Sequence, residues 1–293
     1  MKKAVPIIAL CLLLLLTGCS GKSALPEPAL QESLSVSDTT DASIEQTEVV
    51  FGDILDTHYK LENRVLYGKG ENSFQTIGSD AFYNDWVEIA SNVAAFDYNP
   101  SVLLYLTTDG QVFGKGLMEG GVMQIETDDN NSTLCLAQPA LLFSDAAEIS
   151  LGARFALARK ADGTVWFWGE SKNGQSTEVA DQILSPIQIA EDAIAIKAFL
   201  YNSAWIDKEH TLYICGDNSF GQIGNGEQGN GFPTTFTSNV PEPYAVLENA
   251  LNVWTTEDRQ TVFASTQDGT SYTWGGNQYT VPTPVAAQNI VQS

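Results

Sequence analysis

The chain has 293 residues, with 14 Lys or Arg against 36 Asp or Glu, and its net charge is −22. So acidic a composition argues against binding nucleic acid, whose phosphates need Lys and Arg, and against a polybasic grip on anionic lipid. The charge either keeps the protein soluble through self-repulsion or attracts a cationic partner, and both interpretations stay open.

The N-terminus has the features of an export signal. Lys2 and Lys3 precede an apolar run of 13 residues, 4–16, which is shorter than the roughly 20 residues of a membrane-spanning helix. The following Leu16-Thr17-Gly18-Cys19 resembles the bacterial lipobox, in which cleavage before the cysteine precedes transfer of a diacylglyceryl group to its thiol. We expect a lipoprotein signal peptide over 1–18 and lipidation of Cys19, whereas a plain secretory signal that contains a cysteine is the alternative.

Residues 19–47 comprise the lipidated cysteine and a segment without aromatic residues, rich in Ser, Thr, Pro, Glu and Asp. Such a segment buries too little apolar surface to offset its ordering entropy, so we expect a disordered stalk. The expected location is the bacterial cell membrane, with the lipid as the only anchor and the protein facing outside the cytoplasm. Residues 48–293 remain for one folded domain.

This domain repeats one phrase five times: a turn, an aromatic residue, and a glycine three positions after the aromatic. The copies read RVLYGKGEN at 64–72, DGQVFGKG at 109–116, DGTVWFWGESKNGQ at 162–175, HTLYICGDNSFGQIGNG at 210–226 and DGTSYTWGGN at 268–277. The closing glycines are Gly70, Gly116, Gly169, Gly216 and Gly275, which lie 46, 53, 47 and 59 residues apart by subtraction. Self-similarity at roughly 40–50 residues in a β-rich chain is typical of propeller blades.

A hairpin turn opens each phrase. Three copies carry Asp-Gly, the strongest short hairpin signal, because the turn needs a positive φ. Asn63-Arg64 and Glu209-His210 take its place in the first and fourth copies. Histidine is enriched at positive φ, so we expect His210 to be a turn residue rather than a catalyst.

Strands flank these turns. The aromatic residues Tyr67, Phe113, Trp166, Tyr213 and Tyr272 are expected to pack on a core face, although a ring of aromatic ligand platforms is an alternative. A second strand precedes each turn, at 58–62, 102–108, 155–161, 203–209 and 261–267, and a third lies further upstream at 86–91, 146–150, 193–197 and 250–254.

These elements predict an all-β fold, a five-bladed β-propeller. Residues 283–292 resemble the opening of a blade, but no hairpin follows them. We therefore expect this C-terminal strand to pair with the N-terminal blade and close the ring, which removes an exposed sheet edge.

The strings DGTVWFWG, GDNSFGQIGNG and TSYTWGGN resemble repeats of the regulator of chromosome condensation family. The resemblance covers about residues 50–293 and is weaker in the first two units, where Lys69 and Lys115 replace a Trp. The family's best-known members have seven blades, and the Gly-x-x-His signature of many members is absent here. The family includes a nuclear exchange factor for a small GTPase and a secreted bacterial inhibitor of β-lactamase. The resemblance implies a propeller that binds proteins through loops on one face.

Catalytic motifs are absent from the sequence. It has no Gly-x-Ser-x-Gly elbow, no phosphate-binding loop, and only His58 and His210 for a triad or a metal site. The run Asp128-Asp129-Asn130-Asn131 lacks EF-hand spacing and is interpreted as a polar loop. We expect no catalytic residue, no metal, no cofactor and no enzymatic activity. The alternative is an extracellular carbohydrate-active or hydrolytic propeller that uses acidic residues.

Two cysteines remain in the domain, because Cys11 lies in the signal peptide and Cys19 takes the lipid. Cys215 stands where two sibling units have Trp168 and Trp274, so we expect a small buried core residue. A Cys135–Cys215 disulfide is possible outside the cytoplasm, but no spacing supports it.

The loops that enter the second strands are the expected binding face. Five loop residues are candidates, because Tyr and Arg lead the residue types that carry interface energy and loops concentrate function: Tyr98, Arg154, Phe155, Tyr201 and Arg259. The sequence thus predicts a monomeric, surface-displayed protein that binds an unknown, possibly cationic, protein partner.

Overall fold

The structure, a computed structural model, describes residues 49–126, 134–229, 238–256 and 259–286. The chain divides into two units, Met1–Glu45 and Gln46–Ser293, and every described residue lies in the second. The expected signal peptide, Cys19, the stalk and the run at 128–131 all lie outside the described residues. Within those residues, no helix is long and apolar enough to cross a membrane.

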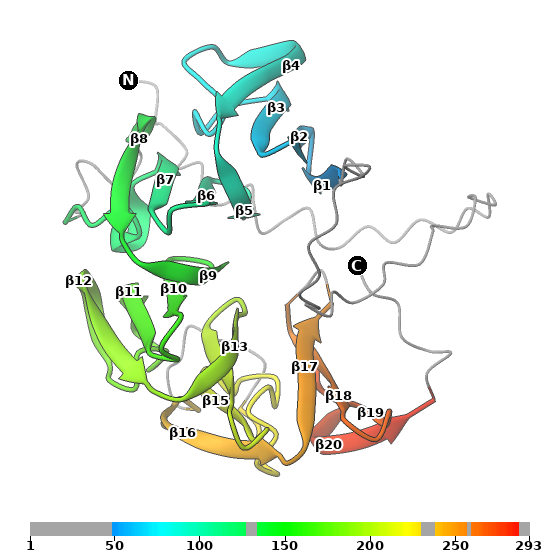
Figure 1. Cartoon of the computed structure of the whole chain (residues 1–293). Coiled ribbons are helices and arrows are strands. Elements are labelled where there is room, and N and C mark those ends of the chain that lie inside the picture. Colours follow the sequence, from blue (N-terminus) through cyan, green and yellow to red (C-terminus); the bar gives the residue numbers. More distant parts are fainter. Residues whose placement is uncertain (1–48, 127–133, 230–237, 257–258, 287–293) are drawn as a thin grey trace, which may run out of the picture. The chain divides into compact units, whose positions relative to one another are not determined.

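The fold is all-β. Five antiparallel sheets of four strands follow one another around an arc, with the first strand of each sheet toward its centre and the fourth at its periphery (Figure 1). Each sheet consists of consecutive strands, and a short 3-10 helix, η1 (Glu119–Gly121), is the one helical element within the described ranges.

The strand bounds are as follows. The first sheet has β1 (Val49–Ile54), β2 (Thr57–Glu62), β3 (Val65–Glu71) and β4 (Phe82–Ala90), and the second has β5 (Val93–Tyr98), β6 (Val102–Thr107), β7 (Val112–Leu117) and β8 (Cys135–Phe143). The third has β9 (Ala146–Leu151), β10 (Phe155–Lys160), β11 (Val165–Ser171) and β12 (Ala180–Ala190). The fourth has β13 (Ala193–Ala198), β14 (Asn202–Asp207), β15 (Leu212–Gly216) and β16 (Val240–Leu247). The fifth has β17 (Ala250–Thr255), β18 (Thr261–Thr266), β19 (Ser271–Gly275) and β20 (Tyr279–Val285).

The predicted hairpins are confirmed. Each turn between the second and third strands carries a residue at positive φ: Arg64 (62°), Gly110 (83°), Gly163 (87°), His210 (64°) and Gly269 (85°). The carbonyl oxygen of this turn residue accepts a hydrogen bond from the first residue of the next sheet, as in Ala250 N to His210 O at 2.7 Å. His210 is therefore a turn residue that also links two sheets.

The second-strand predictions match β2, β6, β10, β14 and β18 to within two residues at either end. The upstream prediction is right for β9, β13 and β17 but wrong at 86–91, which belongs to β4, the last strand of the first sheet. The first strand of the second sheet is instead β5 (VAAFDY), which begins three residues after β4 ends.

The closing glycines have a common steric reason. All five adopt positive φ, and a Cβ on each would collide with the backbone carbonyl of the loop that enters the second strand. In Gly169, for example, the nearest atom to that Cβ would be the Arg154 carbonyl oxygen at 2.5 Å. The glycine thus lets the third strand approach this loop closely.

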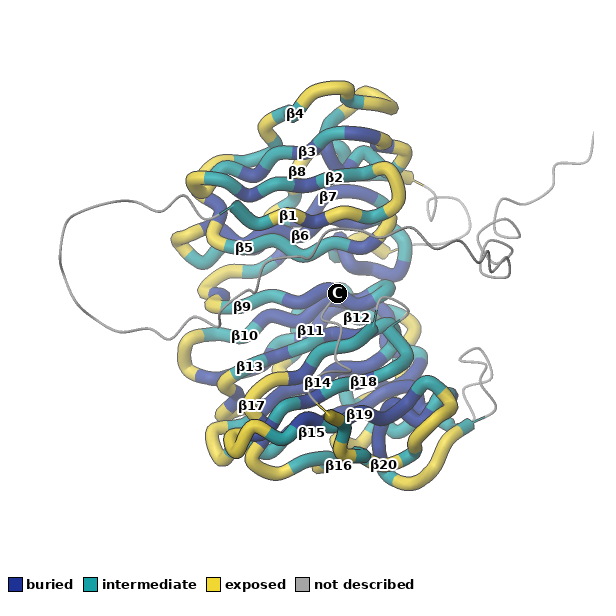
Figure 2. Tube along the Cα trace, turned by 90° about the vertical axis from the view of Figure 1, so that its right-hand side faces the viewer, coloured by how far each residue is buried: buried dark blue, intermediate teal, exposed yellow. Residues whose placement is uncertain are grey.

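The hydrophobic core lies between successive sheets. Four buried clusters fill the four interfaces from the first sheet to the fifth. Figure 2 shows buried positions along the middle strands and exposed positions at turns and outer strands, in line with the fully buried β6 and the largely exposed β4.

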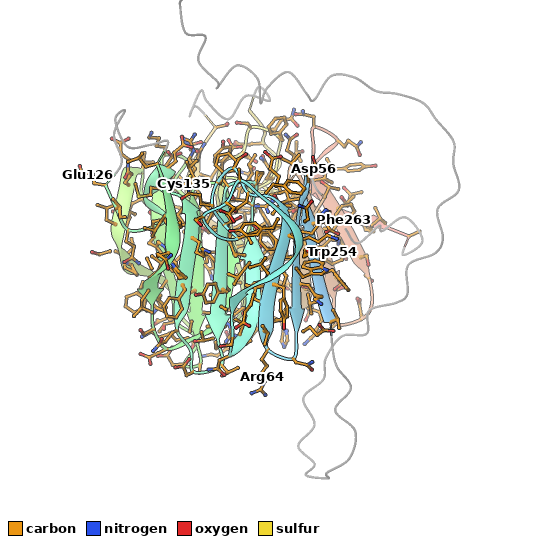
Figure 3. All side chains as sticks on the ribbon, turned by 90° about the horizontal axis from the view of Figure 1, so that it is seen from above. Asp56, Arg64, Glu126, Cys135, Trp254 and Phe263 are labelled. Atoms are coloured by element: carbon orange, nitrogen blue, oxygen red, sulfur yellow. The ribbon has the colours of Figure 1, made fainter. Side chains whose placement is uncertain are left out.

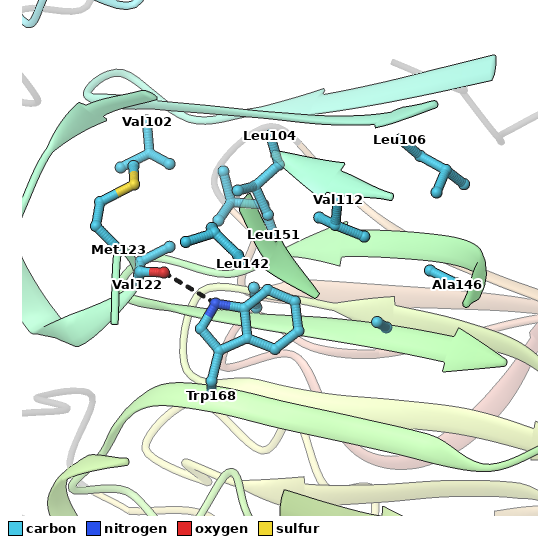
Figure 4. Close-up of a cluster of buried hydrophobic side chains, with 12 residues drawn as sticks. Val102, Leu104, Leu106, Val112, Val122, Met123, Leu142, Ala146, Leu151 and Trp168 are labelled. Atoms are coloured by element: carbon cyan, nitrogen blue, oxygen red, sulfur yellow. Dashed lines mark hydrogen bonds between the residues drawn. The ribbon is translucent and has the colours of Figure 1, made fainter. Parts of the chain in front are cut away.

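A hydrogen bond accompanies each of these interfaces. The residue before the closing glycine donates to a backbone carbonyl in the loop of the preceding sheet. The pairs are Lys115 to Ile77 (2.7 Å), Trp168 to Val122 (2.9 Å; Figure 4), Cys215 to Gln175 (3.5 Å) and Trp274 to Gln222 (2.8 Å). We call these bonds the inter-sheet latches. Lys69, at this position of the first sheet, has no preceding sheet and its ammonium lies 5.3 Å from the centre of the Trp86 ring instead.

The strand aromatics are a partial correction. Tyr67, Phe113, Trp166, Tyr213 and Tyr272 are all partly exposed. The fully buried aromatics include Trp168 and Trp274, whose strand positions point into the interfaces. Each of the first set lies two residues before the residue that precedes the closing glycine and so shares its face of the strand, and Phe113, Tyr213 and Tyr272 pack against the buried clusters.

Ring closure by residues 283–292 is not found among the described residues. Thr283–Val285 belong to β20, which pairs with β19 and completes the fifth sheet. The first sheet takes all of its strands from residues 49–90. Residues 287–292 lie outside the described residues.

Cys135 and Cys215 are free. Cys215 is fully buried, as expected, and burial raises the pKa of its thiol to about 12. It therefore serves as a small core residue rather than a reactive thiol.

Candidate functional site

The sheets have two distinct ends. Figure 3 shows Arg64, on the turn between β2 and β3, at one end and Asp56, on the turn between β1 and β2, at the other. The loops that enter the second strands lie at the second of these, which we call the Asp56 end. It is the end at which the sequence placed the binding residues.

A cavity of about 560 Å³ opens where the first strands of all five sheets finish. Each of β1, β5, β9, β13 and β17 contributes residues near its last position, and Arg259 adds a side chain from the connection to β18. The cavity therefore lies on the common axis of the sheets, at the Asp56 end. Its volume falls within the roughly 300–1,000 Å³ of ligand-binding pockets.

Tyr98 and Arg259 meet at this cavity. The Arg259 guanidinium donates to the carbonyl oxygens of Tyr98 (3.3 Å) and Leu151 (3.2 Å), and so connects the fifth sheet to the second and third. The Tyr98 hydroxyl donates to the Asp53 carbonyl oxygen at 3.4 Å. Burial raises the pKa of this hydroxyl above its usual value.

Arg154 and Tyr201 form a second group at the same end. Arg154 pairs with Glu119 (2.5 Å) and Glu170 (3.4 Å), so its charge is compensated within the chain. Burial raises the pKa of Tyr201, and the positive charge of Arg154 opposes that rise. Neither residue lines the cavity.

Phe155 is a correction. Its side chain is 0% exposed and stacks on Phe167 with ring centres 5.2 Å apart, inside the cluster between the third and fourth sheets. Phe155 is the first residue of β10, and the alternation of strand side chains turns it inward. It packs the core and cannot contact a partner. Binding by Tyr98, Arg154, Tyr201 and Arg259 stays a prediction.

Sequence reasoning missed Lys197 and Trp254, which also line the cavity. Comparison of the five units at one strand position could have indicated both residues. The next-to-last residue of the first strand is Asp53, Asp97, Ser150, Lys197 or Trp254, so its chemistry changes from unit to unit. A position that varies within a constant framework is where a repeat protein builds a site.

Two carboxylates lie in the cavity, and both have partners. Asp97 accepts hydrogen bonds from the backbone N–H groups of Leu151 and Tyr98, each at 2.8 Å, and from Ser150 Oγ at 3.3 Å. Asp53 contacts His58 Nδ1 at 2.6 Å. Within the described residues, no group of three or more His, Cys, Asp or Glu side chains is arranged to hold a metal.

Comparison with solved structures identifies the fold. Yeast Prp20p superimposes with a TM-score of 0.64 at 18% identity, over 80% of this chain and 62% of that one. Yeast RCC1 (Prp20) bound to Kap60 gives 0.65 at 15% identity, over 82% and 64% of the two chains. Human WBSCR16 gives 0.64 at 16% identity, over 82% and 67%.

The chain has the fold of the regulator of chromosome condensation repeat family. The resemblance seen in the repeat strings is confirmed at this level. Among curated proteins, the E3 ubiquitin-protein ligase HERC2 of mouse and human is 22% identical over 183 residues, which is 60% of this chain but 4% of HERC2. No protein-family model matches the sequence.

Proposed function

We propose that this protein is a lipid-anchored, non-catalytic binding protein that presents the Asp56 end of a five-bladed propeller to a protein partner. One observation carries the proposal: residues from all five sheets converge on a single cavity at the loop end of the fold. A surface assembled from the ends of five strands is rigid, and rigid surfaces bind with little ordering cost.

The rim of the cavity offers an anchor for a partner. Leu55, on the turn between β1 and β2, lines the cavity and is 81% exposed. Tyr98 and Arg259 beside it belong to the residue types that lead interface hot spots, and the exposed Leu55 adds an apolar contact for a partner. Among proteins of this fold, the solved structures concern Prp20p with its binding to Gsp1p and histones, and yeast RCC1 bound to Kap60. These examples support protein binding as a use of the fold.

The hydrolytic alternative has weaker support. A hydrolase needs one carboxyl group free to exchange a proton and a second to act as base or nucleophile. Asp97 is instead held by three donors, and Asp53 contacts His58 at the rim. Both carboxylates are better explained as parts of the framework that joins the sheets.

Partner binding is tested with an exposed Leu at each end. Leu55 has a φ of 52°, so Leu55→Asn preserves a residue suited to that backbone and removes the apolar side chain. Leu251→Asn changes a residue that is 57% exposed near the start of β17, at the Arg64 end. Both variants and the wild type are used to capture proteins from host extracts, with quantitative mass spectrometry as the readout. A partner at the Asp56 end should be depleted about tenfold or more by Leu55→Asn and retained by Leu251→Asn. Equal capture by both variants would place binding elsewhere.

The anchor is tested separately. Cys19→Ala removes the thiol that receives the lipid, so we expect an uncleaved precursor or release of the protein from the membrane. Cell fractionation with mass determination of the N-terminus measures both. Normal cleavage with full membrane retention would contradict the lipoprotein assignment.

A further inference from the structure

In the cavity at the Asp56 end, most carboxylate acceptors already have hydrogen-bond partners, whereas several donors do not. Its two carboxylates are acceptors, and three of their four oxygens have hydrogen-bond partners in the chain itself. Both oxygens of Asp97 are occupied, one by Tyr98 N and the other by Leu151 N and Ser150 Oγ. Asp53 receives His58 Nδ1. A ligand therefore finds few free acceptors there.

Several donors in the cavity, in contrast, lack a hydrogen-bond or ion-pair partner. The Trp254 indole Nε1 is buried and has no hydrogen-bond partner. Such an unsatisfied buried N–H normally costs free energy, and in a native site it calls for an explanation. Trp254 lines the cavity and stacks on Phe263, with ring centres 5.8 Å apart.

Two cations line the same cavity without a carboxylate partner. Within the ranges that the structure describes, Lys197 and Arg259 form no ion pair, whereas six other basic residues do: Lys60, Arg154, Arg159, Lys160, Lys172 and Lys208. The Arg259 guanidinium has five N–H donors. Nη1 and Nη2 each donate one hydrogen bond to a backbone carbonyl, which leaves other donors for a ligand. Arg64, Lys69 and Lys115 also form no ion pair among the described residues, but none of these three lines the cavity.

We propose that this cavity binds a carboxylate group, with the Lys197 ammonium and the Arg259 guanidinium as its charged donors and the Trp254 indole N–H as a further donor that ligand entry uncovers. A carboxylate supplies acceptor oxygens only, which is what the unsatisfied groups require. The site holds two cations and two acidic side chains, so a singly charged group suits it better than a phosphate dianion. The inference does not depend on the lipid anchor or on which protein binds the rim.

The carboxylate has two possible sources, a free small molecule or an acidic side chain of a bound protein. The probes are butyrate, which carries a single carboxylate, for the first, and for the second a capped Gly-Glu-Gly peptide with Gly-Gln-Gly as its neutral match. Inorganic phosphate and the cation putrescine complete the set. Binding to the detergent-solubilised full chain is measured by calorimetry and by the ligand-induced rise in melting temperature.

Four variants test the residues. Lys197→Gln and Trp254→Phe remove one donor each, and Trp254→Phe keeps the stack on Phe263. Lys208→Gln and Trp86→Phe are the matched controls, because Lys208 lies on a turn and pairs with Asp192, and Trp86 lies on β4 beneath Lys60. Loss of a charge-assisted hydrogen bond should weaken binding about tenfold or more, and the controls should bind normally. Trp254→Phe should also keep or raise the melting temperature without ligand, since it removes an unsatisfied buried donor.

The outcomes separate the possibilities. Butyrate binding without peptide binding assigns a small-molecule ligand, and discrimination between the Glu and Gln peptides assigns a protein side chain. The proposal is overturned if neither carboxylate binds at millimolar concentration. Preference for phosphate or putrescine, or unchanged affinity in Lys197→Gln and Trp254→Phe, would overturn it equally.

Discussion

At the scale of single residues, the latch position shows how one framework tolerates different chemistry. Trp168 and Trp274 fill it with indole donors, Cys215 with a thiol and Lys115 with an ammonium group. What the fold requires is a donor that reaches the neighbouring carbonyl, not a particular side chain. Lys115 satisfies this requirement at the cost of burying a charge, since it is 3% exposed.

Lys115 should make stability depend on pH. Burial lowers the pKa of its ammonium from 10.5 to about 8. Below pH 8 both states hold the proton and the cost of burying it is fully present. Between about pH 8 and 10.5 the unfolded chain binds more protons than the folded one, so the free energy of unfolding rises with pH. The melting temperature of the wild type relative to Lys115→Met should therefore increase from pH 7 to pH 10.

The control for this measurement is Lys69→Met. Lys69 occupies the same place in the first sheet but is partly exposed and makes no latch. Its melting-temperature difference from the wild type should stay constant over the same range. A constant difference for Lys115→Met as well would show that its charge is not buried in the folded state.

At the scale of elements, the third strand depends on its closing glycine. A Cβ on Gly216, which has a φ of 117°, would collide with the Tyr201 carbonyl, whereas a Cβ on Gly269, at 85°, meets nothing within 4 Å. Both alanine variants lose about 1–2 kcal/mol of stability, because a residue with a Cβ is strained in left-handed backbone. Only Gly216→Ala adds a steric clash. Urea unfolding should show Gly216→Ala to be clearly the more destabilised. Equal losses would mean that the loop moves aside freely.

The elements that the sequence predicted best are those set by local backbone demands. Asp-Gly turns and closing glycines need positive φ, and that need is visible in the residues themselves. The outer strands were predicted least well, because β4 and β16 expose much of their length and lack a clear alternation of buried and exposed residues. Phe155 was misassigned because one residue of strand register decides whether a side chain faces a partner or the core.

The cavity was missed for a different reason. Lys197 and Trp254 come from different units and carry no motif, so only the three-dimensional convergence of the first strands brings them together. The sequence could show the end of the sheets at which the cavity opens, since Tyr98 and Arg259 line it. It could not show which side chains remain without partners, because that depends on contacts between sheets.

At the scale of the whole molecule, Arg259 connects sheets that are far apart in the chain. It reaches Leu151 and Tyr98, which are 108 and 161 residues away. Arg259→Gln should lower the free energy of unfolding by about 2 kcal/mol, because hydrogen bonds from charged donors contribute roughly 1.5–3 kcal/mol each. Arg64→Gln is the control, since Arg64 also has positive φ (62° against 55°) but is exposed on a turn. Chemical denaturation measures both, and similar values would contradict the linking role.

The inter-sheet latches have a consequence for the order of folding. Each joins residues only 38 to 52 positions apart, and each points from one sheet to the sheet that precedes it in the chain. Short loops of similar size close quickly, so the entropy barrier for adding a sheet stays nearly constant along the chain. Assembly can then advance from the first sheet to the fifth by successive docking onto a completed neighbour. The long-range bonds of Arg259 would form last, so the cavity would acquire its shape only when the fifth sheet has docked.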